Sequence, residues 1–233
     1  MEWKLCKPNC LKAQREPMMI TLYTWTTPNG RKASIMLEEV GLPYEVRPVN
    51  IGKDEQFEDE FLRVSPNNKI PGIIDHAAEG GPLAVFESGA ILTYLAEKTG
   101  KLLAPSGHAR YKALEWTFWQ MGGLGPMLGQ LGFFAVRSKE KSPEAIERFT
   151  TESARLFGVM EKRLSHFPYL AGEDYSIADI ACYAWTLAAS TMLKRAAPGA
   201  WGENPAIEAW LATVGERPAV QRGMAVPKVE QPA

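Results

Sequence analysis

The chain has 233 residues, of which 45% are apolar, and its 26 basic and 27 acidic side chains leave a net charge of -1. A chain of this length can bury a large core in one or two domains. The balanced charge gives no electrostatic attraction for nucleic acid, and no apolar run reaches the roughly 20 residues that span a bilayer, so no nucleic-acid or membrane partner is expected.

Residues 1–18 mix charges with prolines and lack the apolar stretch of a secretory signal. They are expected to form a flexible extension, and the protein is expected in the cytoplasm. Cys6 and Cys10 lie in this extension at a spacing that fits neither a two-residue redox turn nor common zinc patterns. Cys182 lies in an apolar run and is expected in the core. An odd count of three cysteines argues against a disulfide framework.

Residues 19–103 carry the pattern of a mixed sheet covered by helices. Apolar and alternating segments predict strands at 20–25, 44–49, 70–75 and 83–86. Periodic segments predict helices at 32–40, 55–64 and 88–98. The resulting order of strand, helix, strand, helix, strand, strand and helix is that of an α/β thioredoxin-like domain.

After residue 103 the strand signals vanish, and an all-α domain is expected over residues 104–223, followed by a tail at 224–233. Helices are predicted at 111–121, 143–164, 177–193 and 205–216. The glycine-rich run at 122–129 contains Pro126 and is followed by no phosphate-binding lysine, so it is interpreted as a bend that lets helices approach closely. Ser176 and Asp179 have the spacing of a capping box.

The first turn with chemical interest is Thr27-Pro28-Asn29-Gly30, between the first strand and the first helix. Thr27 can serve as a helix cap, with Pro28 at the first helical position. The same helix end can also stabilise a thiolate, to which the Thr27 hydroxyl or the Asn29 amide could donate. The turn contains no cysteine or serine, so a sulfur nucleophile would have to come from a ligand.

The second turn precedes the third strand at Lys69-Ile70-Pro71. The Ile70-Pro71 bond is either an ordinary trans bond at a sheet edge or a cis bond. The cis form would leave the backbone N–H and C=O of Ile70 free to pair with an extended peptide, as an added strand does. Lys69 would then lie near the carboxylate of that peptide, or it is a solvated loop residue.

The third turn, Glu87-Ser88, leads from the fourth strand into the third helix. Ser88 can be read as a simple helix cap. A helix start beside a carboxylate also suits an amino-acid head group. In that reading Ser88 binds the α-carboxylate and Glu87 binds the α-ammonium, which are the groups of a γ-glutamyl residue.

The three turns occur within the stretches TPNGRK, FLRVSPNNKIPGI and FESGAILTYLAEKTG, and FWQMGGLGPMLGQ and SIADIACYAW follow. Together these stretches resemble the bacterial nu-class glutathione transferases, relatives of the yeast nitrogen regulator, from about residue 19 to about residue 223. The resemblance implies the cytosolic glutathione transferase architecture. It also implies a homodimer and glutathione, reduced or as the disulfide, as co-substrate, with no tightly bound cofactor and no metal.

The resemblance further implies glutathione-dependent disulfide reduction by thiol–disulfide exchange. It assigns the sulfur to the catalytic residues Thr27 and Asn29. It assigns glutathione binding to Gln56, Ile70, Glu87, Ser88 and Arg148, with Lys69 and Pro71 beside them. Without the resemblance, Arg148 is a solvated helix residue paired with Glu144.

Two other functions remain open at this point. The protein could conjugate glutathione to small electrophiles, or it could be an interaction protein that keeps the ligand pocket without catalysis. Phe133 and Phe134 follow the glycine bend and are expected to line an apolar wall for the second substrate. The physiological second substrate cannot be read from such a wall.

Overall fold

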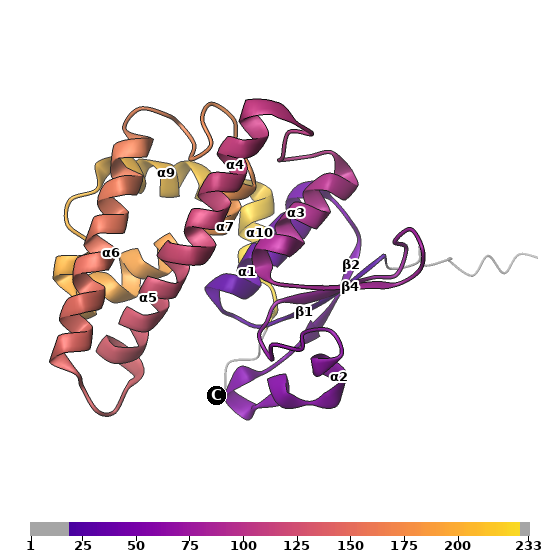
Figure 1. Cartoon of the computed structure of the whole chain (residues 1–233), viewed down its shortest axis with the longest axis horizontal. Helices are drawn as coiled ribbons and strands as arrows, with labels where there is room; N and C mark the ends of the chain where they lie inside the picture. The colour runs from indigo at the N-terminus through magenta and orange to yellow at the C-terminus, as the bar shows by residue number, and fades with distance from the viewer. Residues whose placement is uncertain (1–18, 229–233) are drawn as a thin grey trace, which may run out of the picture.

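The computed structural model describes residues 19–228 (Figure 1). The predicted extension with Cys6 and Cys10, and the end of the predicted tail at 229–233, lie outside the described residues. No helix within 19–228 combines the length and the apolar character needed to cross a membrane.

The four predicted strands form one mixed sheet in the order β2-β1-β3-β4. β1 pairs in parallel with β2, whereas β3 is antiparallel to both β1 and β4. All five residues of β1 are buried, because this strand lies inside the sheet and is covered by helices. The bounds are β1 Ile20–Thr24, β2 Tyr44–Pro48, β3 Gly72–Asp75 and β4 Leu83–Phe86.

The first part of the chain has two full helices, α1 (Pro28–Val40) and α3 (Ser88–Thr99). The predicted helix at 55–64 is wrong. That stretch holds only the short helices η2 (Glu55–Phe57) and α2 (Asp59–Leu62), which follow η1 (Ile51–Lys53). Glu58 has an extended backbone with ψ of 140°, and this conformation ends one helix before the next begins.

The rest of the chain is helical, so the expected class of an α/β thioredoxin-like unit followed by an all-α unit is confirmed. Two predicted helices, those at 111–121 and 177–193, run on through or include π-helical turns, which the helical pattern alone did not separate. The bounds are α4 Gly107–Trp119, η3 Gln120–Leu124, α5 Gly125–Gly132, η4 Phe133–Arg137, α6 Pro143–Leu164, α7 Ile177–Ala188, η5 Ala189–Leu193, α8 Lys194–Ala196, η6 Pro198–Ala200, α9 Pro205–Gly215 and α10 Pro218–Met224.

The predicted capping box at the start of α7 is present. The Ser176 hydroxyl accepts from the N–H of Ala178, and the Asp179 carboxylate accepts from the N–H of Ser176 at 3.0 Å. Asp179 also accepts from the Leu170 N–H and the Trp210 indole, each at 3.0 Å. Burial raises the pKa of Asp179, while these hydrogen bonds oppose the rise. The carboxylate therefore fastens α7, α9 and the loop before α7 together.

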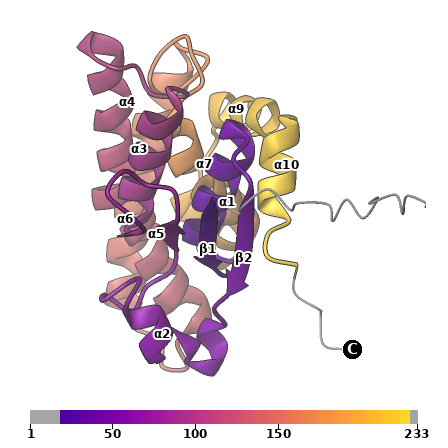
Figure 2. The same ribbon diagram turned by 90° about the vertical axis from the view of Figure 1, so that its right-hand side faces the viewer.

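Helix α1 joins the two parts, because it lies between the sheet and helices α7 and α10 (Figure 2). The Ser34 hydroxyl donates to the Gly223 carbonyl at 2.7 Å. Arg217 forms a two-pronged ion pair with Glu39 at 2.7 and 2.9 Å. One apolar cluster continues from β1 to the helices around Phe157. Helix α1 is thus held against both parts, whereas the domain boundaries near residue 103 remain a prediction.

Candidate active site

The turn before α1 has the cap predicted for it. The Thr27 side-chain oxygen accepts from the Gly30 N–H at 3.1 Å, and Pro28 takes the first helical position. A Cβ at position 30 would collide with the carbonyl oxygen of Trp25, so only glycine fits there. The Thr27 hydroxyl still has its own proton to donate, because the cap uses only an oxygen lone pair.

Asn29 is oriented by Trp185, which lies 156 positions later in the chain. Its Oδ1 accepts from the indole N–H of Trp185, on α7, at 2.8 Å. Because an indole N–H can only donate, this contact fixes which end of the Asn29 amide faces Trp185. The amide NH2 is left as a donor at the start of α1. Residue-level reasoning missed Trp185, for which the only signal was its place in the SIADIACYAW stretch.

The glycine-rich run at 122–129 explains how the Trp185 ring can lie close enough to contact Asn29. A Cβ at Gly129, on α5, would lie 3.3 Å from Cη2 of the Trp185 ring, closer than most Cβ contacts. The expected close approach of helices is therefore found here, although the run forms the π-helical turn η3 and helix α5 instead of a simple bend.

The third turn differs from the simple cap interpretation. Glu87 occupies the cap position, and Ser88 is the first residue of α3. The Ser88 hydroxyl contacts side chains instead of the helix amides, with Lys32 Nζ at 3.4 Å and Met121 Sδ at 3.5 Å. Glu87 is exposed and has a positive φ of 68°. Such a backbone costs energy for a residue with a Cβ and is concentrated at functional sites.

Lys32 lies behind Ser88 and is almost completely buried, with 1% of its surface exposed. Its Nζ donates to Gln120 Oε1 at 2.5 Å and contacts Met121 Sδ at 3.7 Å. Burial lowers the pKa of Lys32 from its ordinary value of 10.5 to about 7, against smaller opposing effects of Cys182 and Glu87. Sequence reasoning missed this residue, although a lysine beside the apolar run Ala33 to Leu37 was a signal.

The Ile70-Pro71 peptide bond is cis, as one of the two interpretations expected. Ile70 is buried with an exposed fraction of 9%, and neither of its backbone groups is hydrogen-bonded to another residue of 19–228. Lys69 is exposed, and its carbonyl accepts from the Ser65 hydroxyl at 2.8 Å. Gln56 donates to Asp54 at 3.3 Å, while its own Oε1 is buried and has no partner among the described residues.

Arg148 lies on α6 and is exposed. The expected pair with Glu144 is not formed, and the charge of Arg148 acts instead on Glu152. Within residues 19–228, no hydrogen bond or ion pair links Gln56, Lys69 or Arg148 to Thr27, Asn29 or Ser88. The structure brings the starts of α1 and α3 together through Lys32 and leaves these three residues apart from that contact.

The chain offers no reactive thiol in the part that the structure describes. Cys182 is fully buried, as expected, and burial raises its pKa well above the usual range for a thiol. A thiol in that state is a poor nucleophile. Residues 19–228 also contain no group of three His, Cys, Asp or Glu side chains placed to hold a metal ion.

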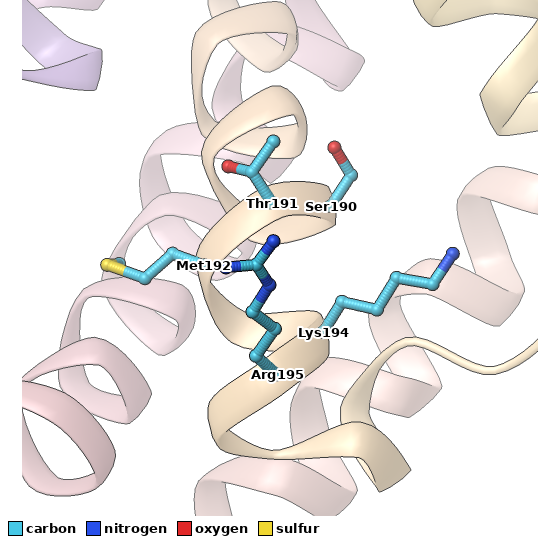
Figure 3. A pocket seen from close by; sticks show the side chains of 5 residues that line it. All are labelled: Ser190, Thr191, Met192, Lys194 and Arg195. Carbon is cyan, nitrogen blue, oxygen red and sulfur yellow. The ribbon is translucent and has the colours of Figure 1, made fainter.

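A surface hollow of about 520 Å³ is lined by none of these residues. Figure 3 shows that its five side chains come from one helical segment, η5 with α8, and fan out from it. They are Ser190, Thr191, Met192, Lys194 and Arg195. A hollow along one helix lacks the convergent polar groups of a binding site, so the starts of α1 and α3 are the stronger candidate.

Comparison with known proteins identifies the family. The family model for the N-terminal domain of glutathione S-transferases matches residues 18–97, and the model for the C-terminal domain matches residues 124–218. The chain is 49% identical to the disulfide-bond oxidoreductase YfcG of Escherichia coli over 88% of this chain and 94% of that protein. The chain belongs to the glutathione S-transferase family. The family expected from the sequence is confirmed.

Other members of the glutathione S-transferase family are similar over nearly the whole chain. The disulfide-bond oxidoreductase YghU of Escherichia coli is 38% identical over 91% of this chain and 76% of its own length. A crystal structure from Pseudomonas fluorescens with two glutathione bound has a TM-score of 0.87 and 45% identity, covering 92% of this chain and 96% of that one. One from Pseudomonas putida with one glutathione disulfide bound has a TM-score of 0.85 and 42% identity, covering 92% and 94%.

Proposed function

We propose that this protein is a glutathione-dependent disulfide-bond oxidoreductase in which Thr27 and Asn29 hold the glutathione sulfur. The observation that carries the proposal is the first turn of α1, where two neutral donors lie at a helix start, while residues 19–228 contain no exposed thiol. The sulfur chemistry is therefore assigned to the ligand. The disulfide-bond oxidoreductases YfcG and YghU, which are similar over most of the chain, support the same activity.

The proposed reaction is two successive thiol–disulfide exchanges. A glutathione thiolate attacks one sulfur of the substrate disulfide, a new sulfur–sulfur bond forms, and the other sulfur leaves as a thiolate that takes up a proton. A second glutathione thiolate then attacks the glutathione sulfur of the mixed disulfide. The products are two substrate thiols and one glutathione disulfide, and the two electrons come from the two glutathiones.

The start of α1 would stabilise the attacking thiolate. Lowering a thiol pKa by one unit requires about 1.4 kcal/mol of selective stabilisation. Hydrogen bonds to a charged acceptor and a helix end each contribute on the order of 1 kcal/mol or more. The Thr27 hydroxyl, the Asn29 amide and the helix end can therefore supply a shift of one unit or more.

The remaining predicted residues are proposed to bind the rest of glutathione. Glu87 and Ser88 would take the γ-glutamyl head group. The free backbone groups of Ile70, next to Pro71, would pair with the peptide, and Lys69 and Gln56 would face it. Arg148 would approach the ligand from α6. Glutathione is proposed as a co-substrate and not as a resident cofactor.

We further propose that two copies of the chain form the working unit, in the cytoplasm. Strand β4 lies at the edge of the sheet and exposes Leu83 and Phe86. Helix α4 exposes Tyr111 and Phe118, which lie two turns apart on one face. Large apolar side chains exposed on these two elements indicate an interface, and a second copy would cover them.

Conjugation of glutathione to an electrophile is the second candidate. The observation in its favour is a set of aromatic side chains after α5, which would form the apolar wall for the second substrate. Phe133 is 46% exposed and packs edge-to-face on Phe134, which in turn stacks on Phe149. Phe133 lies one helical turn beyond Gly129, which faces Trp185.

A side-by-side assay with glutathione separates the candidates. The purified protein is given hydroxyethyl disulfide in one reaction and an aromatic chloride in the other. Strong disulfide turnover with weak conjugation is the expected result. Strong conjugation with weak disulfide turnover would replace the proposal by the second candidate, and no turnover with retained glutathione binding would indicate an interaction protein.

A further inference from the structure

Lys32 is a buried charged residue that the proposed reaction does not use. Lysine is almost never fully buried without a partner of opposite charge, because taking an ammonium out of water is costly. Among residues 19–228 Lys32 has no such partner within bonding distance, since its Nζ contacts there are the neutral atoms Ser88 Oγ, Gln120 Oε1 and Met121 Sδ. The protein thus holds a poorly compensated lysine directly behind Ser88.

The groups around Lys32 come from three elements. Helix α3 contributes Ser88, with Glu87 just before it, and η3 contributes Gln120 and Met121. Helix α7 contributes Cys182. The titratable groups that act on Lys32 are Glu87, which is exposed, and Cys182, which is buried and protonated. Neither provides the close negative charge that a buried ammonium needs.

A ligand carboxylate at Ser88 would provide that charge. The Ser88 hydroxyl can accept from Lys32 with one lone pair and still donate its own proton. In the structure this proton faces the Met121 thioether at 3.5 Å, and a thioether is a weak acceptor. A carboxylate would be a far stronger acceptor and would form a chain from Lys32 through Ser88 to the ligand.

We infer that Lys32 is a positioning residue of the glutathione site, whose ammonium acts through Ser88 as the counter-charge for the γ-glutamyl carboxylate. The inference rests on the proposed glutathione site. Without ligand, the pKa of Lys32 is about 7, because burial disfavours the charged form. An anion nearby raises the pKa of a lysine, so binding above pH 7 is accompanied by uptake of a proton.

The sign of the effect on affinity follows from this linkage. Below pH 7 Lys32 is already charged, and the full affinity is present. As the pH rises from 7 toward the pKa of the complex, a proton must be taken up on binding, so affinity falls by up to about tenfold per pH unit.

Titration calorimetry with S-methylglutathione tests the inference on the full chain. This probe keeps both carboxylates but has no ionisable thiol. Titrations at pH 8 in buffers with different heats of ionisation measure the protons taken up. The expected uptake is about 0.5 to 1 proton per site for the wild type and close to zero near pH 6. Lys32→Met should abolish this uptake and weaken binding about 10- to 100-fold at pH 7. Lys162→Met, on an exposed lysine of α6, should change neither.

The outcomes separate this inference from the proposed function. If the wild type does not bind S-methylglutathione, the proposed function fails and the inference fails with it. Binding without proton uptake, or uptake that survives in Lys32→Met, overturns the inference and leaves the proposed function standing. If Lys32→Met does not fold, the pH dependence of proton uptake by the wild type is the test. Proton uptake on binding that stays constant from pH 6 to 9 would contradict the inference.

Discussion

Trp185 holds the Asn29 amide in one orientation, and in the proposed mechanism this directs the Asn29 NH2 group to the glutathione sulfur. Trp185→Phe removes the indole N–H and lets the amide rotate. We expect disulfide turnover to fall by about ten- to a hundredfold, with a smaller effect on glutathione affinity, because a misplaced donor acts mainly on the reacting sulfur.

Trp201→Phe is the matched control. It removes a buried indole N–H that has no hydrogen-bond partner among the described residues. Steady-state kinetics of both variants should show the loss in Trp185→Phe alone. Equal turnover in the two variants would remove Trp185 from the site.

Lys32 also predicts a pH dependence of stability in the protein without ligand. Its pKa is about 7 in the folded chain, below the ordinary 10.5, so between these values the unfolded chain binds a proton that the folded chain does not. Stability therefore rises with pH in this window, by at most about 1.4 kcal/mol per pH unit. Urea unfolding of the wild type and Lys32→Met from pH 7 to 10 measures the difference, and parallel curves would show that Lys32 is charged in the folded protein.

At the scale of the elements, the packing of α7 depends on the buried carboxylate of Asp179. It accepts three N–H hydrogen bonds, from Leu170, Ser176 and Trp210. Asp179→Ala leaves all three donors buried without a partner. We expect the free energy of unfolding to fall by about 3 to 5 kcal/mol. Asp174→Ala, on an exposed carboxylate of the preceding loop, should change it by less than about 0.5 kcal/mol. Denaturant unfolding distinguishes the two, and a small effect at Asp179 would contradict its role in joining α7 to α9.

The elements also show where sequence prediction succeeds and fails. The fourth strand matched its predicted bounds and the first two came within one residue of theirs, because apolar strand patterns and turn residues mark strands locally. The helix predicted at 55–64 failed because the extended backbone of Glu58 has no marker in the periodicity. The π-helical turns that continue α4 and α7 keep a helical pattern and could not be separated from it.

The candidate site was predictable only where it is local. The helix cap at Thr27 is predicted by the residues next to it in the sequence, and the cis bond before Pro71 was one of two interpretations. The contact of Asn29 with Trp185 joins residues far apart in the chain, and the burial of Lys32 depends on α3 and η3 packing around it. Such contacts are fixed by tertiary packing, which no local pattern records.

For the molecule as a whole, the large apolar side chains exposed on β4 and on α4 predict a dimer. Phe118, on α4, is one of them and has an exposed fraction of 69%. Phe118→Asp places a charge in the proposed interface and should convert the dimer to a monomer, because an unpaired charge is costly to bury. Val159→Asp, at an exposed apolar position of α6, is the control and should stay dimeric. Analytical ultracentrifugation decides, and a monomeric wild type at micromolar concentration would contradict the proposal.

The central claim is that the reacting thiolate belongs to glutathione and not to the protein. The chain has three cysteines, so a variant carrying Cys6→Ser, Cys10→Ser and Cys182→Ala has no protein thiol. The direct measurement is its turnover of hydroxyethyl disulfide with glutathione, after circular dichroism has shown that it folds. Turnover within about twofold of the wild type is predicted, since the site of Thr27 and Asn29 is unchanged. A folded variant that has lost disulfide turnover would contradict the account.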